Sequence, residues 1–504
     1  MNMDSNHRAL RPRNSRVQRA LLPPYRVVSF VVFLTLLPSV GVPVLAQVLA
    51  AKDVSAPKTP EMPKRVQLKV HPAAAPRPAL KYTLLPNLLD QTPGNAEPRY
   101  YVAAQLFADH AKEDFANKLS DWLGVSLGEL PREDVREALD EQAPALQELR
   151  LATRREWCRW DLPIRSEGFN MVLPSLSRFR SLGRLLAVKA RLEISEHRYD
   201  DALDTLQDGF AMAWHVGDAP NLIHSLVGAA IASMMADRVA ELLQAPDAPN
   251  LYWALTELPR PFVDLRTGVQ AETCLVYFTA PELRDLPRKI MTPGEVERLA
   301  DKVFGLAGSA SASGLGAAGW GDRLGSVAWT IKMYPPAKRH LLSLGRSPKD
   351  VDAMPAQQVV LLAALDHYDC WRDELFKWFA LPYWQACEGM KEAETRFSRR
   401  IELEAYPFTA LLPSLGGVYF TTTRLDRQIA AFRCIEAMRM HAAAHDGRLP
   451  ASLAEIDVVP IPLDPMTGAS FSYELAGETA ALHAPAPVGR SAKDGIRYEI
   501  TLTK

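Results

Sequence analysis

Two carboxylates and a histidine stand close together in the second half of the chain, at Asp366, His367 and Asp369. The apolar pattern around them predicts one long helix over residues 355–380. Because residues three apart share a helix face, Asp366 and Asp369 would point the same way. A carboxylate pair beside a histidine could serve general acid–base catalysis. Charged runs of this kind are more commonly a solvated helix face, so we assign no catalytic residue from the sequence.

His441 and His445 are spaced so that both imidazoles could reach one metal ion from the same helix face. The three residues between them are alanines, so the glutamate of the HExxH pattern is absent, and no third ligand can be placed. The alternative is a pair of histidines near a helix C-terminus, where positive charge is favourable. We therefore assign no metal-binding residue.

Tryptophans gather beside charged residues in two places. Trp371, Trp378 and Trp384 follow the acidic run, and Trp157 and Trp160 belong to the segment RREWCRWD. Such aromatics could stack on sugars or clamp a peptide, as a hydrolase with a dispersed carboxylate and aromatic site would require. Aromatics at helical spacing are more often part of the core.

Other signatures of catalysis or of cofactor binding are missing. No GxSxG nucleophile motif occurs, and the Ser-x-x-Lys from Ser55 to Lys58 lies where nothing could hold its geometry. The Gly/Ala/Ser-rich stretch 305–325 lacks the GxxxxGK[ST] pattern, so we expect a mobile loop there rather than a phosphate cradle. We predict no cofactor.

The cysteines show no CxxC or Cys/His metal spacing. In a chain of this size we expect them to be free thiols, mostly buried. Cys370 and Cys387 form the pair that could be bridged, and the sequence leaves this open. The five cysteines are Cys158, Cys274, Cys370, Cys387 and Cys434.

The N-terminus has the order of a secretory signal. Six arginines and one acid precede the apolar run Val27–Leu37, and small residues that suit a signal peptidase follow it. We predict a signal peptide over residues 1–46 with cleavage at Ala46, which implies export to the periplasm or cell envelope. The alternative is an uncleaved membrane anchor, because the uncharged stretch Val27–Ala50 is long enough to span a bilayer.

Proline is in excess, at 39 of 504 residues compared with a usual share of about 5%. Nine of these prolines lie within residues 51–98, which predicts a Pro-rich, extended tether over residues 47–98. The formal net charge is −1 for the chain and −6 without residues 1–46. A mildly acidic chain has no basic surface that would attract nucleic acid.

The remaining sequence predicts a mainly α fold with an irregular body of helical hairpins over residues 99–423. One pair of helices resembles half of a tetratricopeptide unit, through Ala190, Tyr199, Ala202 and Leu206. No second copy occurs at a period of 34, so an ordinary antiparallel hairpin is the simpler interpretation.

The main predicted helices cover residues 131–155, 175–195, 200–216, 221–244 and 355–380. Residues 200–216 have the spacing of a buried stripe of small and apolar residues, and the mostly apolar segment 221–244 should lie in the centre of the body. A capping box at Thr292–Glu295 and a cap at Ser347 predict two further helix starts.

Residues 424–504 predict a small α/β module. An amphipathic helix is expected over residues 424–445, followed by strands near residues 471–475, 479–483 and 496–502. One helix packed on a small antiparallel sheet is the expected arrangement.

This C-terminal stretch resembles the soluble part of type II secretion pseudopilins. The resemblance lies in the helix, in Gly447–Pro450, in Asp464 and Pro465, and in Gly468, Phe471 and Tyr473. In that family a helix leads into a small sheet through a DPxGxxYxY-like turn. Here the helix is not N-terminal and no prepilin cleavage motif occurs, so the resemblance implies a fold fragment and not pilus assembly.

The chain as a whole resembles a family of exported bacterial proteins of the planctomycete type. The resemblance implies export and architecture, because the family has no activity that could be transferred to this chain. The segments that carry it are Leu80–Pro86, Pro93–Ala96, Tyr100 with Tyr101, Pro249–Leu255, Leu258–Pro261 and the C-terminal module.

Together these patterns favour an exported interaction or scaffold module of the cell envelope with a protein or peptide partner. An envelope hydrolase with a dispersed site and a component of a secretion or pilus-like assembly are the alternatives. A hydrolase requires a pocket where carboxylates or histidines converge, whereas a scaffold requires a broad apolar or aromatic groove. Membrane contact is expected only through the N-terminal segment, if that segment is retained.

Overall fold

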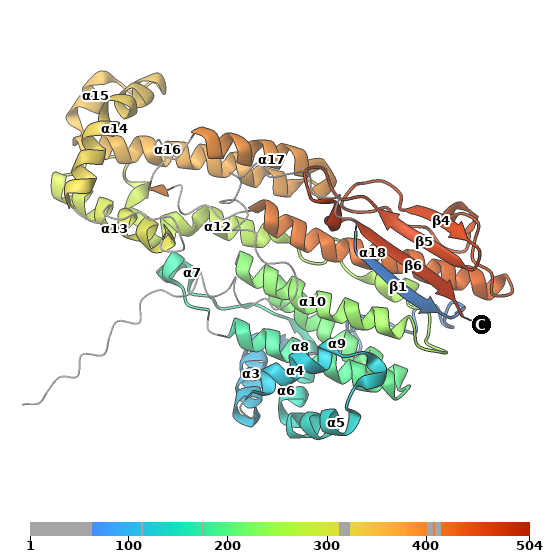
Figure 1. Cartoon of the computed structure of the whole chain (residues 1–504). Helices are drawn as coiled ribbons and strands as arrows, with labels where there is room; N and C mark the ends of the chain where they lie inside the picture. The colour runs from blue at the N-terminus through green and yellow to red at the C-terminus, as the bar shows by residue number, and fades with distance from the viewer. Residues whose placement is uncertain are drawn as a thin grey trace, which may run out of the picture. The chain divides into compact units, whose positions relative to one another are not determined.

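Helices dominate the computed structural model, which describes residues 63–111, 114–173, 175–311, 323–400, 407–408 and 415–503 (Figure 1). A small four-stranded sheet contains the last three strands of the chain. These features confirm the expected mainly α fold with a C-terminal helix-plus-sheet module. The predicted signal peptide 1–46, its cleavage site Ala46 and residues 47–62 of the predicted tether lie outside the described residues.

The first half of the described chain consists of helices joined by short connections. The last three of them pack mainly on a neighbour in sequence, as expected for hairpins, whereas the others pack mainly on helices that are not their neighbours in sequence. The helices are α3 (Glu97–His110), α4 (Phe115–Gly124), α5 (Arg132–Glu141), α6 (Ala143–Thr153), α7 (Ile164–Glu167), α8 (Leu176–Ser195), α9 (Tyr199–Gly217) and α10 (Leu222–Leu242), with short 3-10 turns η1 (Leu127–Glu129) and η2 (Gly168–Asn170).

The second half is also mainly helical and includes the longest helix, which begins at Leu415. Helices α13, α14 and α16 surround one apolar core, seen at the upper left of Figure 1. The elements are α11 (Tyr252–Glu257), α12 (Leu265–Thr279), η3 (Pro281–Arg284), α13 (Pro293–Ser311), α14 (Arg323–Ser343), α15 (Pro348–Ala353), α16 (Ala356–Phe376), η4 (Lys377–Ala380), α17 (Tyr383–Arg400), α18 (Leu415–Ala444), η6 (Leu453–Glu455) and η7 (Ala492–Asp494).

Helices α8 and α9 form the antiparallel hairpin that the sequence predicts. The predicted stripe of small and apolar residues on α9 is buried, and it includes Ala202, Leu206 and Gly209. Gly209 is required by close packing, because a Cβ atom there would lie only 2.1 Å from the sulfur of Met235 on α10. The hairpin therefore packs directly against α10.

Helix α10 is the one described helix that is long and apolar enough to cross a membrane. Most of its residues are buried against α8, α9, α12 and α18. The side chain of Asn221 caps the helix and accepts a hydrogen bond from the backbone N–H of Ile223 at 2.9 Å. This burial agrees with the central position expected for residues 221–244.

Two predicted helix starts have the expected capping geometry. Before α13, Thr292 Oγ1 accepts from the N–H of Glu295 at 3.4 Å, and the Glu295 carboxylate accepts from the N–H of Thr292 at 2.7 Å. Before α15, Ser347 Oγ accepts from the N–H of Asp350 at 3.1 Å. Both caps act locally, so the sequence was sufficient to identify them.

Two predicted boundaries differ from the structure. The helix expected over residues 131–155 is divided into α5 and α6, because Pro144 lacks an N–H and is accommodated only in the first turn of a helix. The loop expected over residues 305–325 is shorter, because α13 continues to Ser311 and α14 begins at Arg323. Residues 312–322 lie outside the described residues.

The C-terminal module contains a mixed sheet rather than the antiparallel sheet expected from the sequence. Its strands are β4 (Ser472–Ala476), β5 (Thr479–Ala484) and β6 (Ile496–Leu502), which pair antiparallel, and β1 (Arg65–Val70), which pairs parallel to β6. The order is β1-β6-β5-β4, so β1 and β4 are the edges. A second, two-stranded sheet pairs β2 (Thr92–Asn95) with β3 (Arg155–Trp157).

Residues 63–98 are folded onto the body, in contrast to the tether expected over residues 47–98. Strand β1 contains no proline, so every residue in it can donate to the sheet. Farther along, Leu84 is buried, and the side chain of Gln207 on α9 donates to Thr83 Oγ1 at 2.8 Å. The prolines separate these docked pieces and do not keep the segment away from the body.

Helix α18 crosses the boundary predicted between the body (99–423) and the module (424–504). It begins at Leu415, before that boundary, and most of its residues are buried. It contacts α10, α11 and α17 of the body. The module is therefore continuous with the helical body.

A buried ion pair on α18 joins segments that are distant in sequence. Glu436 and Arg439 are fully buried, and Arg439 Nη1 lies 3.0 Å from Glu436 Oε2. The side chain of Asn250 donates to Glu436 Oε2 at 2.5 Å, and the backbone N–H of Leu251 donates to Oε1 at 2.8 Å. The carboxylate thus fixes the chain just before α11.

The guanidinium of Arg439 has further partners on two other segments. Its Nε donates to the carbonyl oxygen of His71, and its Nη2 donates to that of Ala248, each at 2.8 Å. The N–H of Ala73 donates to the carbonyl oxygen of Arg439 at 3.1 Å. The segment after β1 and the segment before α11 are both held to α18 by this one side chain and its backbone.

A second buried pair fixes the turn of the C-terminal module. Arg427 on α18 donates to Asp464 Oδ2 at 2.8 Å and to the carbonyl oxygen of Pro485 at 2.6 Å. Asp464 Oδ1 accepts from the N–H of Met466 at 3.0 Å, which stabilises the turn that begins with Asp464 and Pro465. Both charged side chains are buried, so each depends on the other for compensation.

We predict that Glu436→Gln destabilises the folded chain strongly, because it leaves the Arg439 guanidinium buried without a counter-charge. Breaking a buried ion pair costs about 3–5 kcal/mol, which denaturant unfolding would detect. Glu133→Gln is the matched control, because Glu133 is 88% exposed beside Arg136 and such surface pairs contribute about 0–1 kcal/mol. Similar losses in the two variants would contradict this role for Glu436.

Asp426 on α18 makes stability depend on pH. Its carboxylate accepts from the backbone N–H of Phe262 at 2.9 Å, and burial raises the pKa of Asp426 to about 7. An aspartate in the unfolded chain has a pKa near 3.9, so between about pH 4 and pH 7 the folded chain keeps a proton that the unfolded chain releases. The free energy of unfolding therefore falls as the pH rises through this interval.

We predict that Asp426→Asn removes this contribution to the pH dependence. The slope of unfolding free energy against pH should become more positive by up to about 1.4 kcal/mol per pH unit between about pH 4 and pH 7. Urea unfolding curves of both proteins across this interval provide the measurement. An unchanged slope would show that Asp426 does not hold the proton.

Candidate functional site

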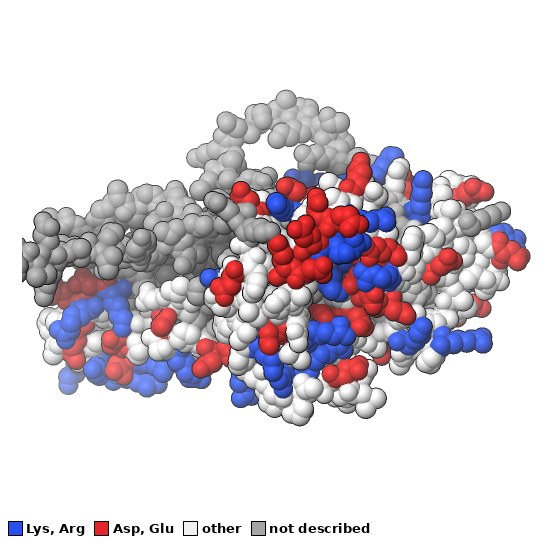
Figure 2. Space-filling model, turned by 90° about the horizontal axis from the view of Figure 1, so that it is seen from below, with Lys and Arg blue, Asp and Glu red and all other residues white. Residues whose placement is uncertain are grey.

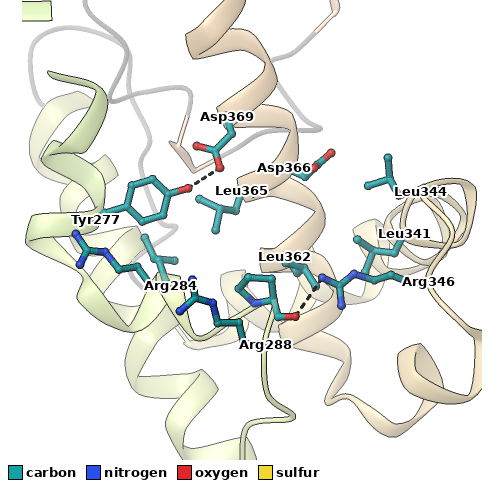
Figure 3. A pocket seen from close by; sticks show the side chains of 12 residues that line it. Tyr277, Arg284, Arg288, Leu341, Leu344, Arg346, Leu362, Leu365, Asp366 and Asp369 are labelled. Carbon is teal, nitrogen blue, oxygen red and sulfur yellow. Dashed lines mark hydrogen bonds between the residues drawn. The ribbon is translucent and has the colours of Figure 1, made fainter. Parts of the chain in front are cut away.

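A cavity of about 310 Å³ lies between α12 and η3 on one side and α14 and α16 on the other (Figure 3). This volume is at the lower end of the range of about 300–1,000 Å³ for small-molecule sites. The apolar lining includes five leucines. The polar lining consists of Tyr277, Arg284, Arg288, Arg346, Asp366 and Asp369.

Helix α16 places both predicted carboxylates at this cavity. Leu362, Leu365, Asp366 and Asp369 recur at spacings of three and four, so they share one helix face. Leu362 and Leu365 also belong to the apolar core that α16 shares with α13 and α14, so the cavity borders this core. The expectation that Asp366 and Asp369 point the same way is confirmed.

The segment that carries Arg288 is fixed to α16 by a buried glutamine. Gln358 donates to the carbonyl oxygens of Leu286 at 3.1 Å and Lys289 at 2.7 Å. Its Oε1 accepts from the N–H of Met291 at 3.0 Å. Because Gln358 is fully buried, these bonds hold the arginine-bearing wall at a set position relative to the carboxylates.

Asp366 is engaged by a histidine that the sequence analysis did not single out. His340 Nε2 on α14 lies 2.8 Å from Asp366 Oδ2. The ring of His340 stacks on that of His367, with centroids 4.0 Å apart. His367 itself is not part of the cavity lining. The predicted group of three is therefore divided, with its two acids at the cavity and its histidine beside it.

Asp369 is engaged by two side chains. The hydroxyl of Tyr277 donates to Asp369 Oδ2 at 2.5 Å, and Arg372 Nη1 donates to Oδ1 at 2.5 Å. Burial raises the pKa of Asp369, and these two partners oppose that rise. Burial also raises the pKa of Tyr277 well above its usual range, and its hydrogen bond to Asp369 adds to this effect. Tyr277 therefore stays protonated and donates a hydrogen bond to the carboxylate of Asp369.

None of the three arginines at the cavity forms an ion pair with another described residue. Arg284 and Arg288 have exposed side chains, and Arg284 lies over the ring of Phe278 at 5.9 Å. Arg346 donates to the carbonyl oxygen of Pro287 at 3.2 Å. In Figure 3 Arg284 and Arg288 lie on the η3 side and Arg346 on the opposite side. The lining has three arginines and two aspartates, so its formal charge is positive.

The predicted aromatic groups do not join the carboxylates. The Trp371 ring packs on Phe397 at 5.7 Å, Trp378 covers Gly389, and Trp384 covers Gly468. None of the three tryptophans lines the cavity. In these positions they pack against neighbouring segments.

The second aromatic pair is also separate from the cavity. Trp160 is buried and stacks on Tyr100 with centroids 5.9 Å apart, and its Nε1 donates to the carbonyl oxygen of His215 at 2.7 Å. Trp157 on β3 is 48% exposed. The two tryptophans thus differ, and Trp160 is part of the core.

His441 and His445 stack with ring centroids 3.9 Å apart at the end of α18. His445 Nδ1 lies 2.8 Å from the carbonyl oxygen of His441, and burial together with His445 lowers the pKa of His441. Among the described residues, no group of three His, Cys, Asp or Glu side chains could hold a metal ion. The described residues therefore place no third ligand beside His441 and His445.

All five cysteines are free thiols, so Cys370 and Cys387 are not bridged. Cys434 is buried, Cys370 is exposed, and the others are partly buried, which only in part matches the expected burial. Burial raises the pKa of Cys370 and of Cys387, so neither is activated as a thiolate.

A second cavity of about 290 Å³ lies beside Trp214 at the end of α9. Its acids are Asp218 and Asp264, of which Asp264 pairs with Arg266 at 2.5 Å. Burial and the nearby Asp264 raise the pKa of Asp218. This lining comes from two short stretches of chain, whereas the first cavity is formed by several separate helices and turns.

Charged side chains elsewhere show no extended field of one sign on the visible face. Figure 2 shows acidic and basic side chains interspersed over this face. Many of them form ion pairs, such as Arg136 with Glu133 and Glu196.

Tyr277, His340 and the three arginines of the cavity were not predicted from the sequence. The spacing of Arg284 and Arg288 by four residues was the only local signal. Arg346 lies 58 residues farther along than Arg288, so only the packing of α14 and α16 brings it to the same cavity.

Comparisons of the chain with protein-family models, with curated proteins and with solved structures found no match. We therefore base the proposed function on the residues of the cavity.

Proposed function

We propose that this chain is an exported interaction module of the cell envelope, and that the cavity between α12, α14 and α16 binds its protein or peptide partner. The observation that supports this is the state of the charged groups. Asp366 and Asp369 are already hydrogen-bonded by neighbours, whereas Arg284 and Arg288 are exposed without ion-pair partners among the described residues. Exposed guanidinium groups at a cavity suit recognition of a ligand.

The hydrolase alternative has weaker support. Two carboxylates do converge at one cavity, as that alternative requires. A general base, however, needs a carboxylate within reach of substrate and able to accept a proton. Asp369 accepts from both Tyr277 and Arg372, and the tryptophans expected to hold a sugar lie elsewhere.

Export is part of this proposal, and it is supported by the signal-like N-terminus and by the resemblance to exported bacterial proteins. We predict that the chain isolated from the source organism begins at Gln47, because cleavage follows Ala46. N-terminal sequencing of the protein from the envelope fraction provides the measurement. A chain that keeps residues 1–46 and stays in the cytosol would contradict export.

We predict that partner binding depends on the two exposed arginines. The tagged mature chain should retain one or a few proteins from an envelope extract, identified by mass spectrometry. The double variant R284Q/R288Q should lose them, because it removes two positive charges from the cavity without removing a buried contact.

The matched control is R132Q/R159Q, which changes the charge equally at two exposed arginines on α5 and after β3. This control should retain the same proteins as the wild type. Equal retention by the wild type and R284Q/R288Q, or no protein retained by the wild type, would contradict the proposed function.

A further inference from the structure

We propose that the cavity recognises a carboxylate carried on a short apolar group, as at the C-terminus of a peptide that ends in an aliphatic residue. This inference rests on the proposed function in one respect, namely that the cavity is the binding site. It adds the chemical class of the ligand.

The charges favour a carboxylate. Arg284 and Arg288 offer guanidinium groups that match the planar, two-oxygen geometry of a carboxylate. The two aspartates reduce the formal charge of the lining to one positive charge. A singly charged carboxylate therefore complements the cavity better than a doubly charged phosphate, which both aspartates would repel.

The positions of the arginines are set by the fold. Gln358 fixes the segment 286–291, and Arg346 is tied to the carbonyl oxygen of Pro287 in the same segment. The Arg288 side chain extends from this fixed segment. Its backbone therefore needs little ordering when a ligand binds, which reduces the entropic cost of binding.

The rest of the lining favours an apolar group beside the carboxylate. Leucine side chains from η3, from α14 and the turn after it, and from α16 line the same cavity as the arginines. Its volume of about 310 Å³ suits a small group rather than a long chain. The lining leucines are Leu283, Leu341, Leu344, Leu362 and Leu365.

The test is isothermal titration calorimetry of the mature chain with N-acetyl-Leu-Leu and with its C-terminal amide. We expect the free acid to bind at least about tenfold more tightly than the amide, because only the acid pairs with the guanidinium groups. R284Q/R288Q should lose this preference, and R132Q/R159Q should keep it. If R284Q/R288Q lowers the thermal midpoint, Arg288→Gln alone replaces it.

Two further probes separate the two parts of the inference. Acetate should bind more weakly than the dipeptide acid, because it lacks the apolar group. Inorganic phosphate should also bind more weakly than the dipeptide acid, because of its second charge. Acid and amide of equal affinity, a dissociation constant of the acid weaker than about 10 mM, or tighter binding of acetate or phosphate would each overturn the proposal.

The outcome is distinguishable from failure of the proposed function. If R284Q/R288Q loses the envelope proteins but the wild type binds acid and amide equally, the proposed function holds and the carboxylate proposal is wrong. If the wild type prefers the acid but retains no envelope protein, the carboxylate proposal holds and the proposed function is wrong.

Discussion

The buried guanidinium of Arg439 sets a constraint on which much of the structure depends. An arginine carries five N–H donors, and burying them is costly unless acceptors within the protein replace water. Glu436 and the carbonyl oxygens of His71 and Ala248 supply these acceptors. The segment after β1 and the segment before α11 must therefore meet α18 at one place. This arrangement also brings β1 to the edge of the C-terminal sheet, parallel to β6.

Helix α18 contacts both the helical body and the C-terminal module. It contacts α10, whose apolar faces hold the α8–α9 hairpin and α12. On the other side, Arg427 fixes the turn at Asp464 that leads into the small sheet. Both buried pairs lie on one helix, so the module cannot be separated from the body at the boundary that composition suggested. Because α18 has buried charges at two positions along its length, a shift of the helix along its axis would separate them from their partners.

The cavity is built in a different way, by side chains that hydrogen-bond one another. His340 and Tyr277 approach α16 from α14 and α12, and each engages one carboxylate. This leaves the guanidinium groups of Arg284 and Arg288 as the charges available to a ligand. The hydrogen bonds to Asp366 and Asp369 therefore favour ligand binding at this cavity, because the same aspartates without partners would have suggested acid–base catalysis.

The sequence by itself determined the features that depend on near neighbours. The helical face shared by Asp366 and Asp369, the caps at Thr292 and Ser347, and the three C-terminal strands follow from periodicity and short-range hydrogen bonds. Tertiary structure alone decided the pairing of β1 with β6, the continuity of α18 with the body, and the meeting of Arg346 with Arg284 and Arg288. These depend on contacts between residues dozens to hundreds of positions apart. Such contacts arise from the packing of whole elements, which leaves no local pattern in the sequence.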